Sequence, residues 1–438
     1  MAWLNKEIAE RWRIEGKRYA SEINKYVQIG MEQGWSENLE TPKEDQRSSF
    51  ATKIVEMIRA ANRAGETKIL REEIPPSSWP ITSKFEDQLQ PVKPVAFLKD
   101  GSLLVHVGGL GLRSTVYMVN GENLDIVPGV SHAGGSRDGA YVALVNEQGI
   151  QVVSNMTADS EGEEVTAYSW QDVQRKLKES ISDFKSLADE EHPESVIEEV
   201  IPFNEGRSLL LVSRYGIYLL GVGGEAELLH PALSELKEFE IEDTIIDMVH
   251  GDVSPDGRWL AYGSQSREHL LKDMRSGEVF AFEPTSSYPH FARFSKDNGE
   301  VWYNACHFYN GSTFKVPLKK VEEGFPDGIA EEWPEMNEEM RVYAAAALKE
   351  GHILGDAYGY LKLIDGEGHE IWRYFVGSTI FGMTVSADEK ILAVGTYGGM
   401  LHLLRLDSGE KSEYSIGTAP ILETDRWLLW KNQEPLRW

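Results

Sequence analysis

Several features that would assign this chain of 438 residues to a familiar class are missing. It has one cysteine, Cys306, so it can form neither an internal disulfide nor a multi-cysteine metal site. No stretch approaches the roughly 18 apolar residues that a membrane-spanning helix needs. The N-terminus is charged from Lys6 onward and lacks the apolar core of a signal peptide. We therefore expect a cytoplasmic protein with no membrane partner.

The common catalytic signatures are also absent. The sequence has no GxxxxGK[ST] phosphate-binding loop, no HExxH zinc helix and no GxSxG nucleophile elbow. Cys306 is followed by His307, but adjacent residues of a strand point to opposite faces, so the two are not a ready nucleophile and base. Whether the protein is an enzyme stays open, and these absences lean against it.

Negative charge predominates and is unevenly distributed. The net charge is −27; residues 1–71 carry 13 Lys and Arg against 11 Asp and Glu, which leaves −29 on the remainder. A body this acidic repels the phosphate backbone, so we expect no nucleic-acid partner. The charge either keeps a large domain soluble or attracts a cationic partner.

Apolar residues at three- and four-residue steps predict a helical region over residues 1–65. A second helix in this region is expected to begin at the N-cap Thr41, with Pro42 and Glu44 in its first turn, and to end at Gly65. The two apolar faces either pack on each other and on the next domain or form a docking or dimerisation surface. The face of the first helix, interrupted by Gly16, consists of Leu4, Ile8, Trp12, Tyr19, Ile23 and Val27.

One pattern recurs after a proline-containing linker at residues 66–92, which has room for one or two edge strands. An apolar strand, a tight polar turn and a second strand return at a spacing of about 40 residues. The clearest copies are VSPDGRWLAYGS (253–264) and VSADEKILAVGT (385–396). A third strand follows each copy, and often a fourth, as in EIWRYFV (370–376) and KSEYSIG (411–417). Four short antiparallel strands repeated radially predict an all-β fold, a β-propeller, over residues 93–438.

The number of blades can be estimated from the repeats. Seven units have most of their strands, and an eighth begins at Pro420 and stops after two strands. Our preferred arrangement has eight four-stranded blades, the last completed by strands from residues 66–92; seven blades with a C-terminal extension is the alternative. Two insertions interrupt the array. Residues 157–192 include a helix capped by Ser169, and residues 319–340 form an acidic surface loop.

These repeats resemble blades of the WD40 and quinoprotein-like β-propeller superfamily. Residues 365–404 are most similar to the quinoprotein-like type, in which a tryptophan late in one blade docks beside the strands of the next, and Trp372 matches that position. The Gly-His and Trp-Asp signatures of WD40 repeats are missing. The resemblance therefore implies an architecture and carries no particular activity or quinone cofactor with it.

Three histidines have related positions before the predicted inner strands. His132 and His250 each stand four residues before the serine of a hairpin turn, and His290 stands five before one. Because the inner strands of a propeller line its channel, we expect these side chains near one channel mouth. They either hold a divalent metal, act as general acid and base, or bond to the backbone and line a wet channel.

The loops between second and third strands should share a rim with these histidines. Arginine and tyrosine are enriched in recognition surfaces, since each combines a large contact area with hydrogen-bonding groups. The alternative interpretation is that these arginines and tyrosines are ordinary loop residues with no binding role. The candidate binding residues of the rim are Arg113, Arg214, Tyr215, Arg267, His269, His307, Tyr309, Tyr358 and Tyr397.

Together these features favour a non-enzymatic interaction module whose rim binds a protein, a peptide or a small ligand. Pre-organised loops on a stiff ring lose little entropy on binding. The alternative is a metal-assisted or histidine acid–base lyase or hydrolase at the channel mouth, acting on a carbohydrate. We expect no cofactor, with a divalent metal as the one open possibility.

Overall fold

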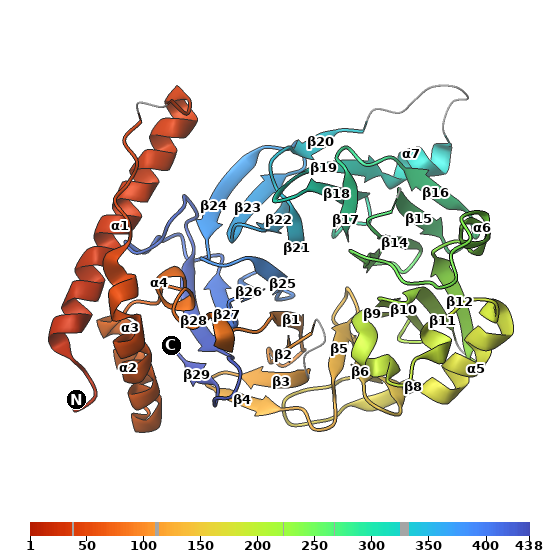
Figure 1. Ribbon diagram of the computed structural model, residues 1–438, viewed down its shortest axis with the longest axis horizontal. Helices are drawn as coiled ribbons and strands as arrows, with labels where there is room; N and C mark the ends of the chain where they lie inside the picture. Colours follow the sequence, from red (N-terminus) through yellow and green to blue (C-terminus); the bar gives the residue numbers. More distant parts are fainter. Residues whose placement is uncertain (37–38, 110–113, 222, 267, 325–332) are drawn as a thin grey trace.

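The chain forms a ring of seven antiparallel sheets with a long helix along its outside (Figure 1). This computed structural model describes residues 1–36, 39–109, 114–221, 223–266, 268–324 and 333–438. The sheets follow one another in chain order, and the first strand of each lies nearest the centre. The predicted β-propeller is therefore confirmed with seven blades, and the preferred count of eight is wrong.

Each blade consists of consecutive strands that pair antiparallel. Blades one to three contain β1 (Val92–Phe97), β2 (Leu103–Val107), β3 (Thr115–Asn120) and β4 (Asn123–Ile126); β5 (His132–Gly135), β6 (Tyr141–Val145), β7 (Gly149–Ser154) and β8 (Glu163–Ser169); and β9 (Ile197–Phe203), β10 (Ser208–Ser213), β11 (Gly216–Gly221) and β12 (Glu225–His230). Blades four and five contain β13 (His250–Val253), β14 (Trp259–Gly263), β15 (His269–Asp273) and β16 (Val279–Phe282); and β17 (Tyr288–Phe294), β18 (Glu300–His307), β19 (Asn310–Pro317) and β20 (Glu335–Asn337). Blades six and seven contain β21 (Val342–Leu348), β22 (Gly351–Asp356), β23 (Tyr360–Asp365) and β24 (Glu370–Phe375); and β25 (Ile380–Val385), β26 (Ile391–Thr396), β27 (Met400–Arg405), β28 (Leu422–Leu428) and β29 (Leu436–Arg437).

A serine and an aspartate explain why the turn between first and second strands is visible in the sequence. Between β13 and β14, the Ser254 hydroxyl accepts a hydrogen bond from the Trp259 backbone N–H (2.9 Å) and donates one to the Asp256 carboxylate (2.7 Å). Three other blades repeat both bonds around Ser136, Ser295 and Ser386. Each turn satisfies its own polar groups locally, so its sequence recurs from blade to blade.

The ring closes by apolar packing between blade seven and blade one. Strand β1 lies beside β25 and β26, and Val92 and Val105 share a core with Ala393 and Leu401. Residues 66–92, which we expected to supply closing strands, instead contain α3 (Thr67–Glu73), α4 (Trp79–Thr82) and the short 3-10 helix η2 (Glu86–Gln88), and the chain joins blade one as its innermost strand. No strand exchange is needed, because the apolar faces of β1 and β26 already match.

Gly395 lets the first and last blades approach. A Cβ atom at this position would lie 1.9 Å from the main-chain oxygen of Val92. We expect Gly395→Ala to lower the free energy of unfolding by about 1–3 kcal/mol, because the clash is with backbone that cannot rotate away. Urea unfolding followed by circular dichroism measures this. Gly366→Ala, where a Cβ meets nothing within 4 Å, is the control; equal losses for the two variants would contradict tight closure at Gly395.

The C-terminal segment completes blade seven. We predicted that an eighth blade begins at Pro420, but Leu422–Leu428 forms β28, which pairs with β27 and runs straight through Asp425. The predicted fourth strand at residues 411–417 is also wrong. That segment lies between α1 and β24 instead: the Asn24 side chain donates to the Ser415 carbonyl (3.0 Å) and accepts from the Gly417 N–H (2.8 Å), and the Phe375 N–H of β24 donates to the Ile416 carbonyl (2.9 Å).

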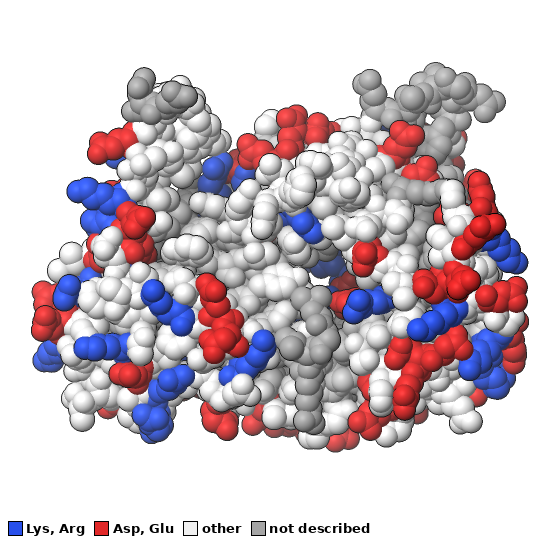
Figure 2. Space-filling view, in the orientation of Figure 1, with Lys and Arg blue, Asp and Glu red and all other residues white. Residues whose placement is uncertain are grey.

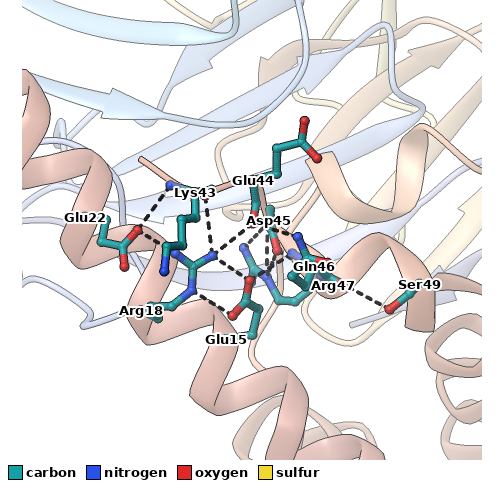
Figure 3. A network of polar contacts seen from close by, with 9 residues as sticks. All are labelled: Glu15, Arg18, Glu22, Lys43, Glu44, Asp45, Gln46, Arg47 and Ser49. Carbon is teal, nitrogen blue, oxygen red and sulfur yellow. Dashed lines mark hydrogen bonds and ion pairs between the residues drawn. The ribbon is translucent and has the colours of Figure 1, made fainter. Parts of the chain in front are cut away.

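The N-terminal region contains α1 (Lys6–Gln33), the 3-10 helix η1 (Gln46–Phe50) and α2 (Ala51–Ala64). The predicted stop at Gly65 is confirmed by its left-handed conformation, whereas the predicted start at Thr41 is wrong. Figure 3 shows the reason: polar contacts hold residues 43–46 against α1. The Arg18 guanidinium lies between the carboxylates of Glu15 and Glu22 and donates to the Glu44 carbonyl. This segment is extended because it bonds to the helix beside it.

The apolar faces of these helices pack on blade seven, as one of the two interpretations predicted. Trp12, Ile54 and Ile58 share a core with Leu428 and Trp438 at the C-terminal end of the chain. The remaining helices are α5 (Trp170–Ile181), α6 (Leu233–Glu238), α7 (Leu318–Glu323) and the short 3-10 helices η3 (Leu187–Asp189) and η4 (Pro193–Val196). The Ser169 side chain caps α5 as predicted. Within the described ranges, no helix combines the length and the apolarity needed to cross a bilayer.

Candidate functional site

One face of the ring displays two sets of loops, those that lead into each blade and those that join its second and third strands. Strand pairing places both at the same end: Tyr288 at the start of β17 lies opposite Cys306 near the end of β18, and His307 pairs with Asn310 across the next turn. We call this side the rim face. It is where the sequence placed its candidate binding residues.

Aromatic side chains gather on the rim face over blades five to seven. Phe308, Tyr309 and Tyr358 are 75%, 64% and 54% exposed, and the rings of Tyr309 and Tyr358 lie 5.8 Å apart although they belong to neighbouring blades. Half-buried Tyr343 and Tyr397 continue the cluster, with ring centroids 6.0 Å apart. We call these five residues the aromatic arc.

Arg341 joins the exposed and half-buried parts of the arc. Its guanidinium lies over the Tyr343 ring, 4.9 Å from the centroid, and donates to the Phe308 carbonyl at 2.7 Å. His307 contacts the Phe308 ring and also bonds to the Ser287 hydroxyl (2.9 Å). These contacts fix the exposed aromatic side chains to the propeller, so the side chains lose less conformational entropy when they bind a partner.

The backbone at Phe308 is unusual. Phe308 and Tyr309 form the two-residue turn between β18 and β19, a kind of turn in which one or both residues adopt positive φ and glycine or asparagine is favoured at such positions. Phe308 nevertheless has φ of +55°. A bulky residue in the left-handed region costs on the order of 1–3 kcal/mol, and such strain concentrates at binding and catalytic sites. The exposed aromatic ring of Phe308 is therefore not explained by folding.

The other predicted rim residues do not all join the arc. Arg214 and Tyr215 lie on the rim face at blade three, where Tyr215 packs near Lys185. His269 was predicted to be a loop residue, but it lies within β15 and is fully buried against Tyr303 (ring centroids 4.6 Å apart). Arg113 and Arg267 fall outside the described residues. The structure thus brings together His307, Tyr309, Tyr358 and Tyr397 from the predicted set.

The three histidines lie at the inner strands, each with a different neighbour. His132 and His250 are the first residues of β5 and β13, equivalent positions as their spacing predicts. His132 packs on His106 (ring centroids 4.3 Å apart), His250 lies 5.9 Å from the His269 ring, and His290 lies 4.8 Å from the Tyr343 ring. Within the described part of the chain, no three His, Cys, Asp or Glu side chains are grouped as a metal site requires.

Burial keeps these imidazoles neutral. It lowers the pKa of His132 and His250 to about 4 and that of His290 to about 3. His250 Nδ1 lies 2.9 Å from the Met248 carbonyl, to which it can donate. Burial also raises the pKa of the Cys306 thiol, and the neighbouring His307 is exposed, so the two do not act as a nucleophile and base.

Ion pairs connect the inner strands deeper in the channel, and the sequence reasoning missed them. Lys93 of β1 reaches Glu199 of β9 (3.1 Å) across blade two. Asp252 of β13 is paired with Arg137, from the turn after β5, and with Arg293 of β17 (3.5 Å). Figure 2 shows Lys or Arg atoms within the central hollow of the ring. The pairs link five of the seven blades and balance most of the charge that they bury.

The pKa values in this cluster reflect both burial and charge. Burial lowers the pKa of Arg293 to about 10, with Arg137 acting in the same direction. Burial raises the pKa of Glu199, but the cations Lys93 and Arg137 outweigh this and hold it below its usual value. The sequence contains a pattern that could have predicted this cluster. Asp252 and Arg293 each stand two residues before the serine of a hairpin turn, and Asp252 lies on the same face of its strand as His250.

Comparisons with known proteins identify no family and no particular activity for this chain. No protein-family description and no curated protein matches the sequence. Similar solved structures include the β-propeller domain of Cps50 (Swd1) from Myceliophteria thermophila (13% identity, TM-score 0.48, 70% of this chain and 93% of that chain covered). Another is hydrazine synthase of Kuenenia stuttgartiensis (13% identity, TM-score 0.47, 73% and 97% covered). Likeness at this level concerns the fold alone.

Proposed function

We propose that this protein is a non-enzymatic interaction module that binds a protein or peptide through the aromatic arc. The observation that carries the proposal is the Phe308-Tyr309 turn, which exposes two aromatic rings although Phe308 has positive φ, a conformation that favours glycine or asparagine. Backbone strain of this kind concentrates at binding and catalytic sites. Large aromatic side chains also supply most of the binding energy in known protein interfaces.

The surroundings of the arc suit recognition. Tyr358 extends the exposed surface onto the neighbouring blade, and Arg341 provides a cation beneath it. Tyrosine hydroxyls and a guanidinium allow hydrogen bonding at the edge of an apolar contact, which is the usual composition of an interface centre. A ring of packed sheets holds these groups with little freedom to lose.

One substitution at Phe308 distinguishes a role in binding from a role in folding, because it should affect affinity and thermal stability in different ways. Phe308→Asn should leave the melting temperature unchanged or raise it, because asparagine tolerates positive φ, and should weaken partner binding at least about tenfold. Tyr309→Ala and Tyr358→Ala should weaken binding similarly. The measurements are thermal unfolding and affinity capture with quantitative mass spectrometry from the native source.

The control is a triple variant that shortens exposed apolar side chains elsewhere on the propeller. Ile126, Val279 and Ile371 are 59%, 47% and 56% exposed on the outer strands β4, β16 and β24. Changing all three to alanine should leave the captured partner in place. If capture survives the three arc substitutions, or is lost equally in the control triple, the arc is not the binding surface.

A further inference from the structure

A second candidate site lies outside the rim face, between the N-terminal helices and the outer edge of blades six and seven. It is a pocket of about 490 Å³, bounded by α1 and η1 on one side, by α3 and α4 on another, and by residues near β24 and β28. Ligand pockets in proteins span about 300–1,000 Å³. Nothing in the proposed function uses this space.

Arg47 stands in one wall of the pocket and is held rigidly. It is 5% exposed, and its Nε and one terminal nitrogen bond to both carboxylate oxygens of Asp45. The contacts in Figure 3 fix the segment that carries both residues, since the Gln46 backbone N–H bonds to Glu15 of α1 (2.8 Å). The other terminal nitrogen, Nη1, has no acceptor among the described residues, and Gly16 of α1 leaves the room that it occupies.

Arg71 and Arg426 line the opposite part of the pocket. Arg426 bonds through two nitrogens to the Glu423 carboxylate (2.7 and 2.8 Å) and through its third to the buried Ser78 hydroxyl (3.1 Å). Arg71 instead donates to main-chain oxygens of Glu423 and Trp438 and forms no ion pair with a side chain in the described residues. Burial lowers the pKa of Arg71, and the neighbouring cation Arg426 adds to this despite opposing carboxylates.

Four acids line the pocket: Glu72 and Glu413 are exposed, with Glu413 paired to Lys17 (2.7 Å), whereas the two inner acids are already engaged. Both oxygens of Asp45 serve Arg47, and the Glu423 carboxylate serves Arg426 and His402 (2.9 Å). Arg47 and Arg71 both line the pocket, and neither the Nη1 of Arg47 nor the guanidinium of Arg71 is paired with an inner side-chain carboxylate among the described residues. A carboxylate or phosphate group accepts hydrogen bonds from guanidinium groups at favourable geometry, and it would offset their buried charge.

Hydroxyl and aromatic groups complete the lining. Ser77 forms no hydrogen bond to the described residues through its hydroxyl, and Tyr19, Tyr414 and Trp79 border the opening. Aromatic walls accommodate a planar or apolar portion of a ligand, while the arginines position its charged end.

We infer that this pocket binds a small organic anion, with its carboxylate or phosphate group at Arg47 and Arg71 and an unsaturated or ring portion against the tyrosines. This site is independent of the aromatic arc, so one can fail without the other. Its ligand would bridge the helical region and the propeller and thereby hold them together.

The test uses three probes that share a ring and differ in charge: phenyl phosphate, benzoate and neutral phenol. We expect saturable binding of at least one anion by isothermal titration calorimetry, and slower hydrogen exchange in residues 71–79 and 412–416 when it is bound. Phenol should do neither. Preference between the two anions identifies phosphate or carboxylate as the natural group. If neither anion binds, or if phenol binds as well as they do, the inference is wrong.

Two glutamate substitutions locate the binding. Ser77→Glu places a negative charge in the lining without removing a described hydrogen bond, and should weaken anion binding at least tenfold. Ser83→Glu makes the same change at an exposed position outside the pocket and should leave affinity unchanged. Arg71→Gln should lose binding as well, with far-UV circular dichroism confirming that the variant is folded. Equal affinities for the two glutamate variants would overturn the assignment.

Discussion

The free energy of unfolding is expected to fall steeply as the pH is lowered from 7 toward 5. Burial lowers the pKa of eight of the 11 histidines, with four near 4 and two near 3: His106, His132, His230, His250, His269, His290, His352 and His402. In the unfolded chain these imidazoles bind protons near pH 6.5. The unfolded state therefore takes up more protons between about pH 6.5 and 4, and each extra proton costs the native state about 1.4 kcal/mol per pH unit.

Urea unfolding at pH 7.5, 6.5 and 5.5 at constant ionic strength measures this dependence. Asp356, whose buried carboxyl has its pKa raised to about 6, opposes the trend by one proton only. His352→Gln should flatten the dependence by about 1.4 kcal/mol per pH unit, while the exposed His369→Gln should not. Stability that stays level between pH 7.5 and 5.5 would contradict the burial of these histidines.

Truncating Trp438 is expected to cost about 3–5 kcal/mol, near the upper end for a single substitution. Trp438 is fully buried, its ring lies 6.2 Å from that of Trp12 in α1, and its indole N–H donates to the Ile74 carbonyl (2.8 Å). Trp438→Ala leaves that acceptor unpaired and opens a cavity between helix and blade. The loss is large because the last strand, the first helix and the linker all meet at this one side chain.

Chemical unfolding of Trp438→Ala checks this, with Trp35→Ala as the matched control. Trp35 is 59% exposed, so its truncation should cost less than about 1 kcal/mol.

Removing residues 1–65 entirely should expose Met400, Leu428 and Leu436 of blade seven and make the propeller aggregate. A stable monomeric propeller without these residues would show that the helices are not part of its fold.

The propeller fold could be predicted from the sequence because the contacts that define each turn are made within a few residues. Ser254 and Asp256 satisfy their own turn within six residues, so the same letters recur wherever a turn of this kind is built. Trp372 also lies where the resemblance placed it, packed beside the strands of blade seven. The blade number was misjudged because Leu422–Leu428 has the same apolar pattern whether it begins a blade or ends one, and its partner β27 is what decides.

The missed features depend on contacts between distant segments. Residues 411–417 have strand-like composition, but Asn24, nearly 400 positions away, bonds to the backbone of Ser415 and Gly417, and Phe375 of β24 bonds to that of Ile416. The aromatic arc was predicted only in part, since Tyr309, Tyr358 and Tyr397 were identified as loop residues and Phe308 and Tyr343 were not. The left-handed turn at Phe308 follows from hairpin length, which required knowing where β18 ends.

Site-specific photo-crosslinking tests the proposed binding surface most directly. Benzoylphenylalanine at Tyr309, in the arc, should crosslink to one protein or peptide partner in the native source. The same group at Ile371, 56% exposed on β24 of blade six, should not. Crosslinking to the same partner from position 371, or no crosslink from position 309 while capture by the unmodified protein persists, would contradict recognition through the aromatic arc.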